Sequence, residues 1–165
     1  TKINNNTLSA ITGLPSAITT GKFLQIVQTS VSSTVTITST SYTDTSVTAS
    51  ITPSSTSSKI FVMVSMQFDA YRSDGADFKS AVKILRDSTT VYENPDAIGS
   101  GVGTGSNGYQ QIWGNVPLNH LDSPSTASSV TYKVQAKNYQ TNGERALRVC
   151  TSSSPSIMTL IEIGV

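Results

Sequence analysis

The stretch "DAYRSDGADF" holds the only cluster of acidic residues in the chain: Asp69, Asp74 and Asp77. A pair of carboxylates can hydrolyse a glycosidic bond, and clustered carboxylates can bind a metal ion. Asp74 precedes Gly75, however, and Asp-Gly is a frequent signal for a hairpin turn, which Asp69 and Asp77 would flank. The spacing also differs from an EF-hand loop, which needs more acidic positions and a distant Glu. We therefore interpret the cluster as a surface turn, and we expect no enzyme.

His120 is the only histidine and Cys150 the only cysteine. A Ser-His-Asp triad would have to use His120, but no Gly-x-Ser-x-Gly elbow lies between a strand and a helix. We interpret His120 as a strand-end residue bonded to backbone. A minority hypothesis is a metal bound by three copies of His120 on a threefold axis. Cys150 is expected in the core, and neither a cofactor nor a metal is expected elsewhere.

Sugar recognition is a second chemistry, which needs aromatic rings for the C–H face of a sugar and planar polar groups for its hydroxyls. The turn-rich segment from Tyr71 to Trp113 holds both types, and we predict that the loops 71–78 and 94–109 face a receptor. The alternative is that Tyr92 and Trp113 are core residues and the loops are only solvated turns. The receptor-binding candidates are Tyr71, Arg72, Asp74, Asp77, Tyr92, Asn94, Asp96, Asn107, Tyr109, Gln110 and Trp113.

Alternating apolar and polar residues predict the strands that must position these groups. The Ser/Thr-rich stretch 29–59 could be a mucin-like stalk, but apolar residues recur there at every second position, which favours two strands. "KIFVMVSMQFDAY" predicts a central strand covered on both faces in its first half. "GYQQIWGNVPLNHL" predicts a strand interrupted by Gly114 and Pro117. "DFKSAVKILRD" fits a helix or a strand, and we prefer the strand. Further strands are expected in "FLQIVQTS", "SVTYKVQAKN", "ALRVC" and "SIMTLIEIGV".

Many short strands separated by turn residues predict an all-β antiparallel sandwich, jelly-roll-like, over residues 22–165. Residues 1–21 are expected to form an extended N-terminal arm, because their apolar residues are too sparse for a core of their own. The final strand is apolar on both faces, so the chain has more apolar surface than one small sandwich needs. We therefore predict a homotrimer. The predicted trimer contacts of the arm are Leu8, Ile11, Leu14 and Ile18.

The composition limits the partners. Charged residues make up only 13% of the chain and the formal net charge is +1, so no basic stripe exists to bind nucleic acid. No apolar run is long enough to span a bilayer, and no signal peptide is visible. The chain begins with Thr1 rather than Met, and we expect it to be the end of a longer protein. Its surface is expected to be neutral and rich in hydroxyl groups.

Several stretches together resemble a known family. "GKFLQIVQT" precedes the Ser/Thr-rich strands, "ITPSSTSSKIFVMV" and "LDSPSTASSVTYKVQ" follow, and "IMTLIEI" ends the chain. This pattern resembles carboxy-terminal domains of tailed-phage tail fibres and related virion proteins, frequent in marine and cyanobacterial phages. "LSAITGLPSAITTG" resembles the junction between their shaft and domain. The resemblance covers nearly the whole chain but is weak over 69–119.

The resemblance implies a homotrimeric β-structured tip that contacts the host surface or caps a fibre, and it assigns no binding residue. We expect an extracellular tip domain at the distal part of a tail fibre, joined to an upstream shaft or other virion proteins. Its receptor would be a host cell-surface polysaccharide or lipopolysaccharide, bound without membrane insertion. The alternative is a purely structural virion protein, such as a capsid decoration or a fibre-capping trimerisation module.

Overall fold

The computed structural model describes residues 21–72, 78–100, 110–139, 145–150 and 154–164, and it gives no side-chain detail for residues 100, 110 and 145. These residues form ten β-strands and no helix, so they contain no helix that is long and apolar enough to cross a bilayer. The strands are β1 (Lys22–Val31), β2 (Val35–Ile37), β3 (Thr43–Ile51), β4 (Lys59–Arg72), β5 (Phe78–Arg86), β6 (Thr89–Ser100), β7 (Gln110–Asp122), β8 (Val130–Asn138), β9 (Arg145–Val149) and β10 (Ser156–Gly164).

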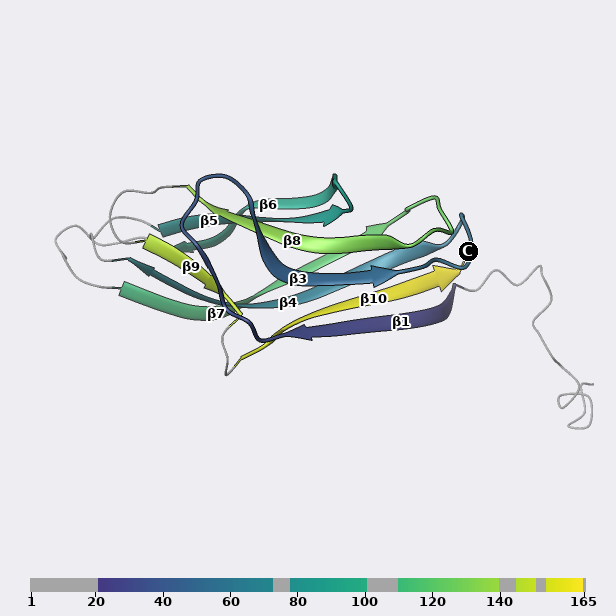
Figure 1. The fold of residues 1–165 in the computed structure, drawn as a ribbon, viewed down its shortest axis with the longest axis horizontal. Helices are drawn as coiled ribbons and strands as arrows, with labels where there is room; N and C mark the ends of the chain where they lie inside the picture. Colours follow the sequence, from purple (N-terminus) through teal and green to yellow (C-terminus); the bar gives the residue numbers. More distant parts are fainter. Residues whose placement is uncertain (1–20, 73–77, 101–109, 140–144, 151–153, 165) are drawn as a thin grey trace, which may run out of the picture.

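Two antiparallel sheets face each other (Figure 1). The six-stranded sheet has the order β1-β10-β4-β9-β2, and β7 pairs with the other edge of β4. The four-stranded sheet has the order β3-β8-β5-β6. The predicted all-β, jelly-roll-like antiparallel sandwich is therefore confirmed. The strand prediction for "DFKSAVKILRD" is also confirmed, because β5 pairs in a hairpin with β6.

The core lies between the sheets, and strict alternation along the strands fills it. In β8, Val130, Tyr132, Val134 and Ala136 are buried, while the residues between them are partly exposed. Ile60, Val62 and Met66 of β4 lie opposite them, and Cys150 is buried in the same core, as predicted. A side chain at every second position of a strand points to one face, so this pattern follows from the sequence alone.

The Ser/Thr-rich stretch is folded, as β2 and β3, with Ile37, Val47 and Ile51 buried. The register of β3 against β8 shifts between Asp44 and Thr48, a bulge that interrupts the ladder of backbone hydrogen bonds. The hydroxyl of Thr45 donates to the carbonyl of Val134 at 2.8 Å, and that of Thr48 to the carbonyl of Tyr132 at 2.9 Å. Threonine therefore supplies both the β-branched shape and the hydrogen bonds that the bulged backbone lacks.

Two details differ from the sequence predictions. β7 runs without interruption through Gly114 and Pro117, because the strand lies at a sheet edge and pairs only with β4 among the described strands. Gly114 lets the Phe68 side chain lie close, since a Cβ atom there would lie 2.9 Å from the ring of Phe68 and the ring would have to shift. β4 is central, but Met63 is 40% exposed, so the outer face of its first half is not covered within the described chain.

Candidate functional site

β4 ends, and β7 and β9 begin, at one end of the sandwich, opposite the end where β1 begins (Figure 1). Arg72, at the end of β4, pairs with Gln110 of β7 on one side and with Arg145 of β9 on the other. Whatever precedes Lys22 therefore enters the sandwich at one end, and the candidate site lies near the other.

A buried carboxylate organises the outer face of the six-stranded sheet at this end. Asp69 on β4 is only 3% exposed. Its Oδ1 accepts a hydrogen bond from Nε2 of Gln111 on β7 at 2.6 Å, and its Oδ2 pairs with Nη1 of Arg148 on β9 at 3.0 Å. The Arg148 guanidinium also lies 4.5 Å from the ring centroid of Tyr71. Side chains from three strands thus meet here: the amide of Gln111 and the guanidinium of Arg148 contact the carboxylate of Asp69, and the ring of Tyr71 lies against the guanidinium.

Trp113 stands directly opposite Asp69 in the register of β4 and β7, and it is 68% exposed. Tyr71 is its diagonal neighbour on the same face, since residues two apart on a strand point the same way. We call Asp69, Tyr71, Gln111, Trp113 and Arg148 the Trp113 cluster. A flat, exposed indole beside fixed planar polar groups is a surface that can stack against a sugar ring and hydrogen-bond its hydroxyls.

The structure separates the receptor candidates chosen from the sequence. Tyr71 and Trp113 come together in the Trp113 cluster. Arg72 neighbours Tyr71 but points inward and is 1% exposed, so it cannot contact a receptor without a rearrangement. Asp74, Asp77, Asn107 and Tyr109 lie outside the described residues, as does the side chain of Gln110. The predicted trimer contacts Leu8, Ile11, Leu14 and Ile18 lie outside them as well.

The remaining candidates lie on β6, in the other sheet. Asp96 pairs with Lys79, and the backbone N–H of Asp96 donates to Oδ1 of Asn94 at 3.1 Å. Tyr92 is partly buried, and its ring lies 6.1 Å from the ring of His120. These residues therefore form no common surface with Trp113.

Gln111 and Arg148 were not among the sequence candidates. Both occupy polar positions in strands where apolar and polar residues alternate, and this pattern predicts only that their side chains point outward. What makes them part of a site is the pairing of β4 with β7 and β9, which brings them to Asp69 from positions 42 and 79 residues away. No local sequence signal carries that information.

His120 lies on β7, and its ring lies near the ring of Tyr92 of the same chain. Among the residues that the structure describes, no group of three or more His, Cys, Asp or Glu side chains could hold a metal ion. A metal bound by three chains would need contacts between chains, so the minority hypothesis for His120 stays a prediction.

Two further carboxylates are buried, and both join the sheets. Glu162 of β10 accepts hydrogen bonds from the N–H and hydroxyl of Ser54 at 2.7 and 2.6 Å, and from Nε2 of Gln25 at 2.6 Å. Burial by itself would raise the pKa of Glu162, but the hydrogen bonds, those of Ser54 foremost, outweigh it and lower the pKa to about 2. Glu162 therefore remains ionised and ties the loop after β3 to the six-stranded sheet.

Asp122 of β7 is the second buried carboxylate. Nη1 of Arg86 on β5 contacts its two oxygens at 2.9 and 2.7 Å, and the hydroxyl of Tyr132 on β8 donates to Oδ2 at 2.6 Å. Burial and the bond to Asp122 raise the pKa of Tyr132 above its ordinary value, so this hydroxyl stays protonated and donates. The network links the two sheets, and its groups are already paired, which suits a structural role.

No protein-family model matches this sequence, and a search of curated proteins finds no match. Among solved structures, the chain resembles T=1 particles derived from infectious bursal virus, with 10% identity and a TM-score of 0.40 over 84% of this chain and 38% of that one. It also resembles the T13 particle of IBDV, with 11% identity and a TM-score of 0.39 over 84% and 37% of the two chains. The chain thus spans less than half the length of these capsid chains, and we draw no functional conclusion from so distant a likeness.

Proposed function

We propose that the chain is a virion module that binds a host cell-surface glycan through the Trp113 cluster, without cleaving it. The observation that carries this proposal is the 68% exposure of Trp113 beside Asp69, which is 3% exposed and whose two oxygens contact Gln111 and Arg148. The side chains of Gln111 and Arg148 are already held in place by Asp69, so little conformational entropy is lost when a ligand binds to them.

The position of the cluster supports a place at the tip of a fibre. β1 begins at one end of the sandwich, and β4 ends and β7 and β9 begin near the opposite end (Figure 1), where these three strands carry the Trp113 cluster. A domain attached through its N-terminus would therefore present Trp113 away from the attachment. Together with the resemblance to tail-fibre carboxy-terminal domains, this favours an extracellular homotrimer at the distal part of a tail fibre, joined to an upstream shaft or other virion proteins. Its receptor would be a polysaccharide or a lipopolysaccharide.

A second candidate is a purely structural virion module, a capsid decoration or a fibre cap without a receptor. Exposed apolar side chains on the outer face of the six-stranded sheet, such as Ile26 and Leu121, favour it, because such side chains are suited to permanent contacts with protein. The two candidates differ in one respect: only the first needs Trp113 to contact a ligand.

Binding of the purified domain to an array of bacterial polysaccharides and lipopolysaccharides tests the proposal. We expect Trp113→Ala to weaken binding at least tenfold, about 1.4 kcal/mol, while the melting temperature stays within about 2 °C. Tyr139→Ala is the matched control, since Tyr139 is also an exposed aromatic residue, 39% exposed, but directly follows β8 of the other sheet. Unchanged binding in Trp113→Ala would show that the glycan is not bound at the Trp113 cluster, and no glycan bound by the native chain would support the structural module instead.

A further inference from the structure

The outer face of the six-stranded sheet carries a row of apolar side chains. The register aligns Ile26 of β1, Ile161 of β10, Phe61 of β4 and Leu121 of β7 across four strands. Ile26 is 62% exposed and Leu121 48%. The next rows add Phe23, 73% exposed, and Met63, 40% exposed. Monomeric proteins expose single apolar residues, but aligned ones on neighbouring strands form a continuous patch.

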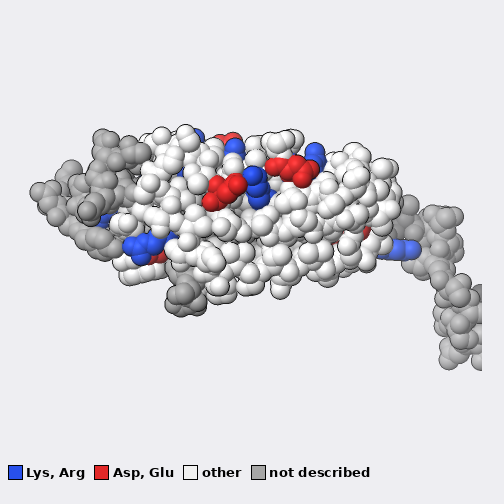
Figure 2. Space-filling model, viewed as in Figure 1, with Lys and Arg blue, Asp and Glu red and all other residues white. Residues whose placement is uncertain are grey.

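Charge is absent from the middle of this face. Between the rows of Lys59 and Asp69, the outward positions of these four strands hold no charged residue. Figure 2 shows the same contrast from one side: charged side chains gather over β3 and β8, while the middle of β1 and β10 has none. We call these outward residues the apolar face. They are Ile26, Gln28, Ser30, Phe61, Met63, Ser65, Gln67, Asn115, Pro117, Asn119, Leu121, Ile157, Thr159 and Ile161.

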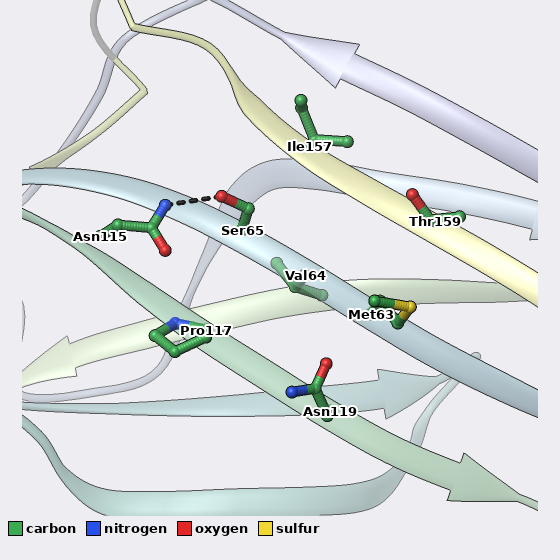
Figure 3. A pocket seen from close by; sticks show the side chains of 8 residues that line it. All are labelled: Met63, Val64, Ser65, Asn115, Pro117, Asn119, Ile157 and Thr159. Atoms are coloured by element: carbon green, nitrogen blue, oxygen red, sulfur yellow. Dashed lines mark hydrogen bonds between the residues drawn. The ribbon is translucent and has the colours of Figure 1, made fainter.

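The apolar face also has a shallow hollow of about 310 Å³ (Figure 3). Ser65 lines it beside Asn115, together with the larger side chains of Met63, Pro117 and Ile157. Nδ2 of Asn115 donates to the Ser65 hydroxyl at 2.6 Å, so part of the polar surface of the hollow is already satisfied. A hollow of this size can receive an apolar side chain from another molecule.

The area of the apolar face is that of a subunit contact. Four strands at about 4.8 Å spacing and roughly ten residues at about 3.3 Å rise cover on the order of 600 Å² in projection. A stable interface of ordinary size buries about 800 Å² of accessible surface on each partner, and the accessible surface of a face exceeds its projection.

We propose that the apolar face is the surface through which copies of this chain pack together. A second copy fits better than a charged partner, because the face offers no charge to pair. Its polar side chains are mainly the amides Gln28, Gln67, Asn115 and Asn119, each of which donates and accepts, so the face is complementary to itself. Around a threefold axis, each apolar face would contact the same face of the two other copies.

This inference refines the proposed homotrimer by naming its contact surface, and it does not depend on glycan binding. The test measures the mass of the intact chain by light scattering at micromolar concentration. We expect the native chain to give a multiple of 17.4 kDa, and Ile26→Lys and Leu121→Lys each to give 17.4 kDa. Both side chains are largely exposed in the single chain, so lysine should not unfold it, and circular dichroism would verify the β-structure.

Thr90→Lys is the matched control. Thr90 is exposed and β-branched like Ile26, and β6, like β1, is the last strand of its sheet among the described strands. This variant should keep the native mass. A monomeric native chain, or Ile26→Lys and Leu121→Lys variants that remain assembled, would overturn the proposal. So would a chain that becomes monomeric only when residues 1–20 are deleted, because the arm would then hold the copies together. Trp113→Ala should stay assembled, which separates this contact from the glycan site.

Discussion

Two rows of residues that cross the two sheets show how differently the outer faces are built. On the four-stranded sheet, Asp44, Gln135, Lys83 and Glu93 lie in register across β3, β8, β5 and β6. On the six-stranded sheet, the corresponding row is Ile26, Ile161, Phe61 and Leu121. The first row suits a surface in water, and the second suits a surface covered by protein.

The charged face is also internally paired. Nε2 of Gln135 donates to Asp44 at 2.7 Å, Nζ of Lys133 lies 3.2 Å from the same carboxylate, and Nζ of Lys83 lies 4.2 Å from the ring centroid of Tyr42. The six-stranded sheet also carries Glu162 and Asp122, but these two carboxylates point inward. Glu162 accepts hydrogen bonds from Ser54 in the loop after β3, and Asp122 accepts them from Arg86 on β5. The six-stranded sheet therefore directs these charges toward its neighbouring sheet and leaves its outer face free for another chain.

The largest change in stability is expected from the inward carboxylates. Glu162→Gln keeps the shape of the side chain but leaves the donors of Ser54 with an amide in place of a carboxylate. We expect the free energy of unfolding to fall by about 2 kcal/mol, because hydrogen bonds to a buried charge are worth about 1.5–3 kcal/mol each and only part is lost. Urea unfolding measures the loss. Glu93→Gln, on the charged outer face, should change stability by less than about 0.5 kcal/mol, and an equal loss in both variants would contradict the comparison.

Acid should weaken the same contact. The pKa of Glu162 is about 2 in the folded chain and 4.5 in its ordinary state, so the contact contributes fully above about pH 5. Its contribution falls as the pH drops from about 5 toward 2, because the unfolded chain takes up the proton first. We expect the native chain to lose stability over this interval more steeply than Glu162→Gln. Parallel curves for the two chains would show that another group causes the loss.

The smallest effect is expected on the charged outer face. Asp44→Asn removes an exposed ion pair with Lys133, and exposed pairs contribute little because water and salt screen them. The free energy of unfolding should change by less than about 0.5 kcal/mol, and the mass of the assembly should not change at all. Loss of assembly in Asp44→Asn would mean that the charged face, rather than the apolar face, holds the copies together.

The period of two in the sequence was sufficient to predict most strands, including those of the Ser/Thr-rich stretch, because a half-buried strand needs an apolar side chain at every second position. It did not predict what covers the outer face of β4. Phe61 and Met63 suggested cover on both faces of β4, but their sheet has nothing on its outer face within the described chain. Gly114 and Pro117 suggested an interruption of β7, but β7 is continuous, because an edge strand tolerates both residues and Gly114 leaves room for the ring of Phe68.

The sequence by itself determined the fold class and the types of residue available for recognition, since both depend on local alternation and composition. It identified Tyr71 and Trp113 by type but also Arg72, which alternation along β4 directs inward. Only the tertiary structure decided which residues meet: the pairing of β4 with β7 and β9 places Gln111 and Arg148 on Asp69, and the pairing of β1, β10, β4 and β7 aligns Ile26 with Leu121. Register between distant strands is set by the packing of the whole core and cannot be read from any one segment.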